Sequence, residues 1–415
     1  MTIISLFGRR IASLAVVCGT AAVLSLASAG ASEQSVHEFR GKGDGSNPQA
    51  GLIADVAGNF YGTSAAGGGG AGCNNGKSGC GTVYKITNRG KEKVLYAFQG
   101  GCDGALPFGG VVEDLQGNLY GTTSFGGVCN SNEGYGTVFK LSPNGSETVL
   151  YAFQGSSDGE GPIGNLTLDS SGNLYGTTEF GGDTAACGGL GCGVVFKVTP
   201  SGQETVLYAF QGSTDGFYPL AGVVMDRTGN LFGTAAEGGS QSSNCFDGCG
   251  TVFKIAPEGT ETTLYAFQGG TDGWLPRSGL MLDSQGNLYG TTSGSAGGNA
   301  GTVFEVAPNG SESVLYSFQG GSQGSVPWAG VVMDGSGNLF GTTSSGGGHG
   351  CKMYGGCGII FELTAQGQEQ VLHAFHKTEG HFPAASLLID SQGNLYGTTV
   401  EGGKHNRGVV FELKP

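Results

Sequence analysis

A six-residue phrase recurs seven times along the chain, and this repetition constrains the fold more than any other feature. The intervals between copies lie between 51 and 59 residues. The phrase is Gly-Asn-(Leu/Phe)-(Tyr/Phe)-Gly-Thr, and it begins at Gly58, Gly117, Gly172, Gly229, Gly286, Gly337 and Gly393. A fixed period of this kind is typical of repeat proteins, in which each unit packs on its neighbours. A repeat architecture also lets 415 residues fold without a single oversized core.

Each repeat contains four segments that predict β-strands. In the second repeat these segments are residues 110–114, 118–123, 136–141 and 148–153. They are rich in β-branched and aromatic residues, and Gly, Asn, Asp, Pro and Ser separate them, as between the strands of β-hairpins. The chain's 85 glycines cluster in short runs between such segments. Because interior glycine weakens a helix, this distribution favours turns and strands.

The two ends of the repeat array complement each other. The last repeat has three strand-like segments, at 386–390, 394–400 and 408–413, while residues 36–39 near the N-terminus match a fourth strand. One N-terminal strand therefore completes the last blade and closes a ring. We expect an all-β, seven-bladed β-propeller of four-stranded blades, since closure removes exposed sheet edges. The expected blades span about 51–99, 109–154, 164–211, 221–268, 278–319, 329–376, and 385–414 plus 35–40.

The N-terminus has the features of a secretory signal. Arg9 and Arg10 precede an apolar stretch from residue 11 to 26, followed by small residues that suit cleavage. We therefore expect a signal peptide at 1–29, a propeller at 30–415, and a secreted or extracytoplasmic protein in the periplasm or at the cell surface. No later apolar run reaches the roughly 18 residues of a membrane span.

The charge balance bears on possible partners. Without residues 1–29 the chain has 17 Lys and Arg against 33 Asp and Glu. Nucleic-acid binding needs a basic face, which this composition does not provide. We expect no nucleic-acid partner, and we expect a monomer.

Ten cysteines follow Cys18, which lies within the expected signal peptide. Eight form close pairs and two lie further apart, and each close pair occupies the same part of its repeat. An even number in an exported chain predicts disulfides, with metal ligation as the alternative. The predicted pairs are Cys73 with Cys80, Cys102 with Cys129, Cys187 with Cys192, Cys245 with Cys249, and Cys351 with Cys357.

The repeat unit also resembles a known family. The pattern Asp-x-x-Gly-Asn-Leu-Tyr-Gly-Thr-Thr, then Gly-Thr-Val-Phe-Lys-Leu, then Val-Leu-Tyr-Ala-Phe-Gln-Gly, as at 114–155, is similar to the choice-of-anchor tandem repeat GloVer proteins of bacteria. The resemblance covers nearly all of residues 35–415 and implies an exported bacterial repeat protein without an established activity. The Asp-x-x-Gly-Asn turn also resembles NHL-type propellers, which implies that 110–114 is the inner, channel-lining strand.

Two kinds of connection share one face of a propeller, and we name it the loop face. They are the connections from an outer strand to the next inner strand and those from the second to the third strand. Residues that vary around a repeated proline in the first kind should lie near the channel mouth. They could bind a ligand, because aromatic rings at a rigid concave mouth suit a glycan, or they could pack between blades. The candidate ligand-binding residues are Phe108, Phe217, Tyr218, Trp274, Arg277, Trp328 and Phe382.

An acidic residue recurs before Gly in the same connections. A ring of such carboxylates could bind calcium, the one cofactor that the sequence suggests. Alternatively each aspartate caps its own turn, since Asp-Gly is a strong turn former. The candidates are Asp44, Asp103, Asp158, Asp215 and Asp272, with Glu379 and Gln323 at the remaining positions.

Histidines gather late in the chain on expected loops of the loop face. With Glu379, the residues His376, His381 and His405 are candidates for acid–base catalysis, and His349 lies in the same region. The alternative is that they are ordinary surface residues. No phosphate-binding loop is present.

These features favour a secreted, non-catalytic propeller that binds a glycan or protein ligand at the bacterial surface or outside the cell. One alternative is a propeller enzyme, a lyase or hydrolase, with its site at the channel mouth, which requires His381, His405 or Glu379 to converge. The other is a structural component of the extracellular matrix, which requires a channel plugged by side chains.

Overall fold

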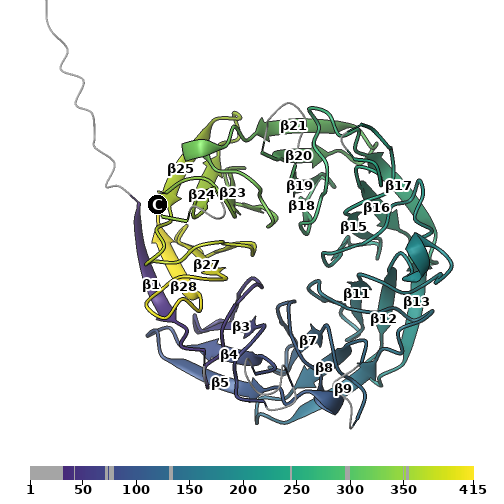
Figure 1. Cartoon of the computed structure of the whole chain (residues 1–415), viewed down its shortest axis with the longest axis horizontal. Coiled ribbons are helices and arrows are strands. Elements are labelled where there is room, and N and C mark those ends of the chain that lie inside the picture. Colours follow the sequence, from purple (N-terminus) through teal and green to yellow (C-terminus); the bar gives the residue numbers. More distant parts are fainter. Residues whose placement is uncertain are drawn as a thin grey trace, which may run out of the picture. The chain divides into compact units, whose positions relative to one another are not determined.

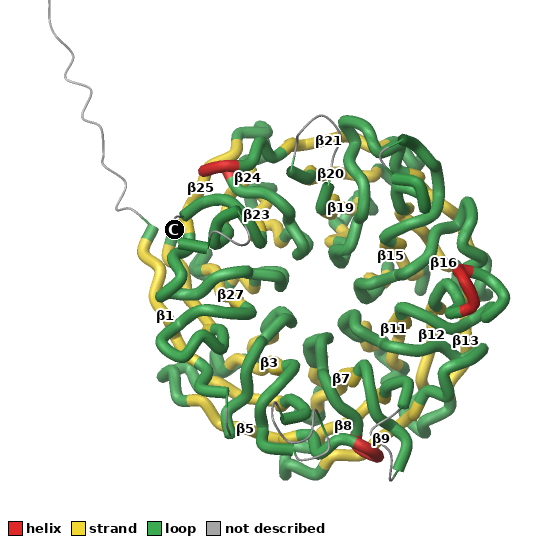
Figure 2. Tube along the Cα trace, in the orientation of Figure 1, coloured by secondary structure: helices red, strands yellow, loops and turns green. Residues whose placement is uncertain are grey.

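Seven four-stranded antiparallel sheets stand around a common axis in the computed structural model (Figure 1). This confirms the predicted all-β, seven-bladed propeller. The structure describes residues 31–415 apart from 42, 71–72, 74–78, 130–133, 244, 295–299, 349 and 352–354, so the predicted signal peptide lies outside it. The described part contains no α-helix. Its only helices are three 3-10 turns, η2 (Gly101–Asp103), η3 (Cys187–Gly189) and η5 (Gly321–Gln323) (Figure 2).

Each blade runs from a short inner strand to a longer outer strand. The inner strands are β2 (Ile53–Ala54), β6 (Val112–Glu113), β10 (Thr167–Leu168), β14 (Val224–Met225), β18 (Met281–Leu282), β22 (Val332–Met333) and β26 (Leu388–Ile389). The second strands are β3 (Phe60–Ser64), β7 (Leu119–Thr123), β11 (Leu174–Thr178), β15 (Leu231–Ala235), β19 (Leu288–Thr292), β23 (Leu339–Thr343) and β27 (Leu395–Thr399).

The third and fourth strands complete the blades. The third strands are β4 (Thr82–Ile86), β8 (Thr137–Leu141), β12 (Val194–Val198), β16 (Thr251–Ile255), β20 (Thr302–Val306), β24 (Ile359–Leu363) and β28 (Val409–Lys414). The outer strands are β5 (Glu92–Ala97), β9 (Glu147–Ala152), β13 (Glu204–Ala209), β17 (Glu261–Ala266), β21 (Glu312–Ser317), β25 (Glu369–Ala374) and, in the seventh blade, β1 (Ser32–Glu38).

The third blade shows why the signature phrase repeats. Gly172 has φ 82°, a left-handed backbone that suits glycine in the hairpin turn. Asn173 and Tyr175 both donate side-chain hydrogen bonds to Asp169, at 2.8 and 3.1 Å. Thr177 Oγ1 donates to the carbonyl of Ala221 in the next blade at 2.7 Å. The phrase therefore closes a turn and joins neighbouring blades.

The second glycine of the phrase makes room for a ring from the third strand. A Cβ atom on Gly176 would lie 2.7 Å from the Phe196 ring, closer than real Cβ contacts allow. The Phe196 ring in turn meets Phe153 of the preceding blade edge-on at 5.1 Å. Seven such pairs, at 5.1 to 5.2 Å, hold the core between blades: Phe39–Tyr84, Phe98–Phe139, Phe153–Phe196, Phe210–Phe253, Phe267–Phe304, Phe318–Phe361 and Phe375–Phe411.

The N-terminal strand closes the ring as predicted. β1 pairs antiparallel with β28, from Ser32 opposite Lys414 to Glu38 opposite Val409. Figure 1 shows β1, in purple, beside the yellow β28. The register shifts between Ser35 and His37, so this pairing contains a bulge.

The inner strands are shorter than the sequence suggests, as β6 spans two residues in place of the expected 110–114. The reason lies at Gly110, whose backbone N–H donates to Asn165 Oδ1 of the next blade at 2.7 Å. A Cβ there would also lie 3.1 Å from the carbonyl oxygen of Gly51 in the preceding blade. The chain at Gly110 thus bonds to the next blade and lies close against the preceding one.

Candidate functional site

A left-handed residue before each repeated proline joins adjacent blades at the loop face. In six blades a non-glycine residue has φ between 56° and 61° there, although such residues rarely adopt this backbone. Leu106 is an example: its N–H donates to the carbonyl of Cys80 in the preceding blade, and its carbonyl accepts from Ser124 in its own blade. The seven positions are Asn47, Leu106, Gly161, Tyr218, Leu275, Val326 and Phe382.

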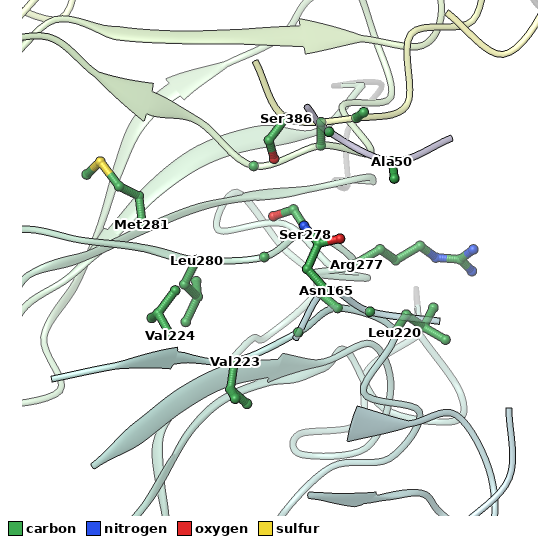
Figure 3. Close-up of a pocket in the computed structure, with 18 of the residues that line it drawn as sticks. Ala50, Asn165, Leu220, Val223, Val224, Arg277, Ser278, Leu280, Met281 and Ser386 are labelled. Carbon is green, nitrogen blue, oxygen red and sulfur yellow. The ribbon is translucent and has the colours of Figure 1, made fainter. Parts of the chain in front are cut away.

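The residue after the proline faces the central channel. The channel is a cavity of about 660 Å³, within the usual range for a small-ligand site. Its loop-face mouth is formed by Gln49, Phe108, Ile163, Leu220, Arg277, Trp328 and Ala384. In Figure 3, Arg277 and Leu220 lie toward one end of the cavity, and Val224 and Met281 toward the other. The mouth therefore carries one residue from each blade, and these seven positions differ in chemistry.

Small residues line the channel further in. Five of the seven equivalent positions are glycine, and a Cβ on Gly222 would lie 2.0 Å from the carbonyl oxygen of Asn165. Asn165 and Ser386 are the exceptions, and both line the cavity (Figure 3). The channel is therefore open at this level and is not plugged by large side chains. Its recognition groups must come mainly from the mouth.

Trp328 is the large aromatic that the mouth exposes. Its exposed fraction is 37%. The Phe382 ring meets it edge-on at a centroid distance of 5.1 Å. The Arg277 guanidinium carbon lies 5.9 Å from its ring centroid, within cation–π range. Contacts on two sides hold this ring in place at the edge of the channel.

Acidic residues near Arg277 add charge that the sequence interpretation missed. Glu179 and Glu237 are half-buried on the loop face. Burial raises the pKa of Glu179, and the nearby Arg277 opposes that rise. Burial likewise raises the pKa of Glu237, Asp247 adds to the rise, and Arg277 opposes it. Glu179 and Glu237 stand shortly before the Gly-Gly that follows the second strand. Most blades have Ala, Ser or Phe at these positions, so the departure from the repeat could have identified the two acids in the sequence.

Four predicted ligand residues do not line the channel cavity: Phe217, Tyr218, Trp274 and Phe382. The backbone of Phe217 forms an isolated antiparallel β-bridge with Glu237 of its own blade, and Phe217 is 9% exposed. Its ring meets Tyr218 edge-on at 4.7 Å. Trp274 occupies space that a side chain at Gly294 would need, with a hypothetical Cβ 2.2 Å from the indole. These side chains pack beside the mouth, whereas Phe108, Arg277 and Trp328 line the channel itself.

The recurring aspartates bind their own loops. Asp103 Oδ2 accepts from the Tyr96 hydroxyl at 2.9 Å and from the Gln99 N–H at 2.8 Å. The same two kinds of donor reach Asp158, Asp215 and Asp272. Asp44 accepts from the Arg40 N–H at 3.0 Å. These bonds support the turn-capping interpretation, and calcium binding stays a prediction.

The candidate acid–base residues have separate partners. Glu379 lies 3.3 Å from His373 and also accepts from the His376 N–H. His381 is 3% exposed, and its Nε2 lies 3.1 Å from Glu401. Burial lowers the pKa of His381 and Glu401 opposes this effect. Burial raises the pKa of Glu38, contacts with Lys404 lower it below its ordinary value, and the nearby His405 adds to the lowering. His349 lies outside the described residues.

All five predicted disulfides form: Cys73–Cys80, Cys102–Cys129, Cys187–Cys192, Cys245–Cys249 and Cys351–Cys357. Each lies in loop-face connections. Disulfides of this number indicate an oxidising, extracytoplasmic environment. Within the described ranges, no helix is long and apolar enough to cross a membrane.

A second cavity, of about 750 Å³, lies between the fourth and fifth blades on the opposite face. Its wall includes Asp226, Asp283 and Pro308, which belong to the repeated turns. Because the same turn residues occur in other blades, this cavity is a weaker candidate for a specific site than the channel mouth.

Comparisons with known proteins agree with this architecture. A family model described as the Gloeobacter/Verrucomicrobia repeat matches residues 18–185, 70–282 and 241–415. No curated protein matches the chain.

Several solved structures are similar to this chain. The extracellular domain of a protein described as a hybrid two-component system of B. thetaiotaomicron has a TM-score of 0.55 at 11% identity, covering 92% of this chain and 39% of that one. Puromycin hydrolase has a TM-score of 0.54 at 13% identity, covering 85% and 50%. A gluconolactonase from Xanthomonas campestris has a TM-score of 0.39 at 14% identity, covering 72% and 82%. At identities this low, the two matches with TM-scores above 0.5 establish a common fold and nothing further.

Proposed function

The chain belongs to the Gloeobacter/Verrucomicrobia repeat family, and from that premise we propose that it is a secreted, monomeric, non-catalytic propeller that binds a glycan at the loop-face mouth of its channel. The observation that carries the proposal is Trp328, an exposed indole held between Phe382 and Arg277 above the channel. A fixed aromatic face stacks on the apolar face of a sugar ring at little conformational cost.

The surroundings of Trp328 supply polar partners for such a ligand. Arg277 can donate hydrogen bonds to sugar oxygens, and Glu179 and Glu237 can accept them. Exposed aromatic side chains also favour this face, because Phe125, Tyr135, Phe246 and Trp328, the large aromatics exposed in the described part of the chain, all lie in its connections.

Glycan-array binding by the full chain tests the proposal, with calcium and with EDTA. We expect a saturable, selective signal that Trp328→Ala reduces at least about tenfold, since a central anchor contributes more than about 1.4 kcal/mol. Phe246→Ala is the matched control, because Phe246 is an 81% exposed aromatic on the same face but does not line the channel. Loss of the signal in EDTA that added calcium restores would support a calcium requirement.

Two results would overturn the glycan proposal. One is an array without any saturable signal, which would favour a protein ligand or a structural role. The other is equal binding by the wild type and Trp328→Ala.

A hydrolase or lyase is the second candidate, because His381 and Glu401 form a close pair on the loop face. The burial of His381 leaves Glu401 as the member that a substrate could reach. Incubating the protein with the glycan that the array identifies distinguishes the two functions. Intact glycan supports binding alone, whereas cleavage that Glu401→Gln abolishes and Phe246→Ala preserves would establish an enzyme.

A further inference from the structure

The outer edge of the ring repeats one contact in four blades and changes it in the other three. Toward the end of an outer strand, Tyr96, Tyr151, Tyr208 and Tyr265 each donate a hydrogen bond of 2.8 to 3.0 Å to the aspartate of the following loop. Tyr316 keeps the aromatic residue but donates to Glu369. In the sixth and seventh blades the tyrosine is replaced by His373 and His37. This change exchanges a hydroxyl donor for an imidazole, which can coordinate a metal.

The closing strand brings a third group to the first of these histidines. His373 lies on β25, Glu379 lies in the loop that follows, and Glu33 comes from β1 at the other end of the chain. His373 Nε2 and Glu379 Oε2 are 3.3 Å apart. One ligand atom from each residue lies within 4.8 Å of the other two, and in the described part of the chain no other group of three His, Cys, Asp or Glu residues meets this criterion.

Two atoms of this group are shielded from solvent. His373 Nε2 has Glu379 as its close partner, and Glu33 Oε1 accepts no hydrogen bond from a described residue, as is also true of the equivalent glutamates Glu92, Glu147, Glu204, Glu312 and Glu369.

We propose that Glu33, His373 and Glu379 bind a divalent transition metal, for which zinc is the best match. Zinc accepts imidazole nitrogen together with carboxylate oxygen, and water can complete a tetrahedral site with three protein ligands. Calcium fits less well, because it prefers oxygen ligands alone. This site is distinct from the channel mouth, and its argument does not rest on glycan binding.

The metal would fasten the closing strand across a blade boundary. The ladder bonds of β1 are made to β28 within the seventh blade, whereas His373 and Glu379 belong to the sixth. A shared ion therefore adds a link between blades at the place where the two ends of the chain meet. Because a metal that binds only the folded state stabilises it, zinc should raise the temperature of unfolding.

The neighbouring histidine provides an internal control. His37, also on β1, lies 3.6 Å from Asp44. Burial, and then the negative charge of the nearby Asp44, raises the pKa of Glu92 to about 7. These three residues occupy the equivalent position in the next blade but do not come together as closely as the Glu33 group.

Zinc titration of the full chain, without an affinity tag and under non-reducing conditions, tests the proposal. We expect calorimetry to give one zinc ion per chain, and we expect a melting temperature that rises with zinc and returns with EDTA. His373→Tyr restores the residue of the other blades and should fold, and we expect it and Glu33→Gln to weaken zinc binding at least tenfold. His37→Tyr should bind zinc as the wild type does.

Three outcomes would overturn the metal site. They are the absence of stoichiometric zinc binding by the wild type, unchanged affinity in His373→Tyr, and an equal loss of affinity in His37→Tyr. Glycan binding by the same variants should be unaffected, so failure of this proposal is distinguishable from failure of the proposed function.

Discussion

The two faces of the ring are built on opposite plans. On the face opposite the loop face, which we call the turn face, an Asp and an Asn close the same hairpin in every blade, as Asp114 and Asn118 do in the second. On the loop face the backbone connections repeat, but the residues that they present differ, as Phe108, Arg277 and Trp328 show. The difference teaches that repetition marks what holds the ring together, while departures from it mark what a ligand can recognise.

The largest effect on stability should come from breaking the turn face. Asp114→Ala removes the acceptor for the N–H groups of Gln116 and Asn118, the Asn118 amide and the Tyr120 hydroxyl. We expect the free energy of unfolding to fall by about 2–3 kcal/mol, because several hydrogen bonds to a charged group are lost together. Urea denaturation measures the change.

The control for this variant is Asp183→Ala on the loop face, where an exposed aspartate accepts one backbone hydrogen bond. It should change stability by less than about 1 kcal/mol. Equal losses in the two variants would remove the proposed difference between the faces.

The pH dependence of stability should separate the turn-face aspartates from the acids of the outer edge. Hydrogen bonds hold the pKa of Asp55 at about 2, against the effect of burial. Its contribution to stability is therefore present above its ordinary pKa and lost as pH falls toward 2. Burial, reinforced by an aspartate of the preceding blade, raises the pKa to about 7 in Glu92, Glu147, Glu204 and Glu312.

Because the pKa of these glutamates is higher in the folded chain than in the unfolded chain, their contribution to the free energy of unfolding is complete below about pH 4.5. It is lost as the pH rises toward 7. We expect thermal stability to be highest near pH 4–5. Glu147→Gln should reduce the fall in melting temperature above pH 5 and leave the fall below pH 4 unchanged. A melting temperature that rises steadily from pH 5 to pH 8 in both the wild type and Glu147→Gln would contradict the raised pKa of these glutamates.

The smallest effect should come from relieving backbone strain on the loop face. Val326 has φ 57°, whereas the third blade has Gly161 at the same position. Left-handed backbone costs a non-glycine residue about 1–2 kcal/mol, partly offset by the greater freedom of glycine in the unfolded chain. Val326→Gly should therefore raise the free energy of unfolding by about 0.5 kcal/mol.

Leu106→Gly sharpens this test, because Leu106 packs against a buried cluster although it has the same backbone. It should lower the free energy of unfolding. If both variants are destabilised alike, packing outweighs strain at this position in general.

The sequence predicted the ring because its signals are local and periodic. The signature phrase, the unmatched strand at residues 36–39 and the paired cysteines each depend on neighbouring residues or on counting. The composition of the mouth was predicted less well. The left-handed backbone before each proline determines which residue faces the channel, and it placed Trp328 there but not Tyr218. Only Gly161 and Asn47, whose residue types tolerate a left-handed backbone, hinted at it in the sequence.

The group at Glu33 could not be found from sequence spacing. Its members lie on β1 and on the sixth blade, and ring closure alone brings them together. The substitution of histidine for tyrosine at His373 was visible in the aligned repeats, but its partner from the other end of the chain was not.

The pairing of β1 with β28 also has a consequence for the order of events in synthesis. Gln34 and Glu412 share a hydrogen bond across 378 positions of sequence. A ribosome delivers Gln34 before the first six blades and Glu412 after them, so six blades can form before the seventh acquires its outer strand. Joining the two ends and cutting a loop elsewhere would preserve the ring, and a different blade would then be built from strands at opposite ends of the chain. Circularly permuted chains should therefore differ in which blade forms last.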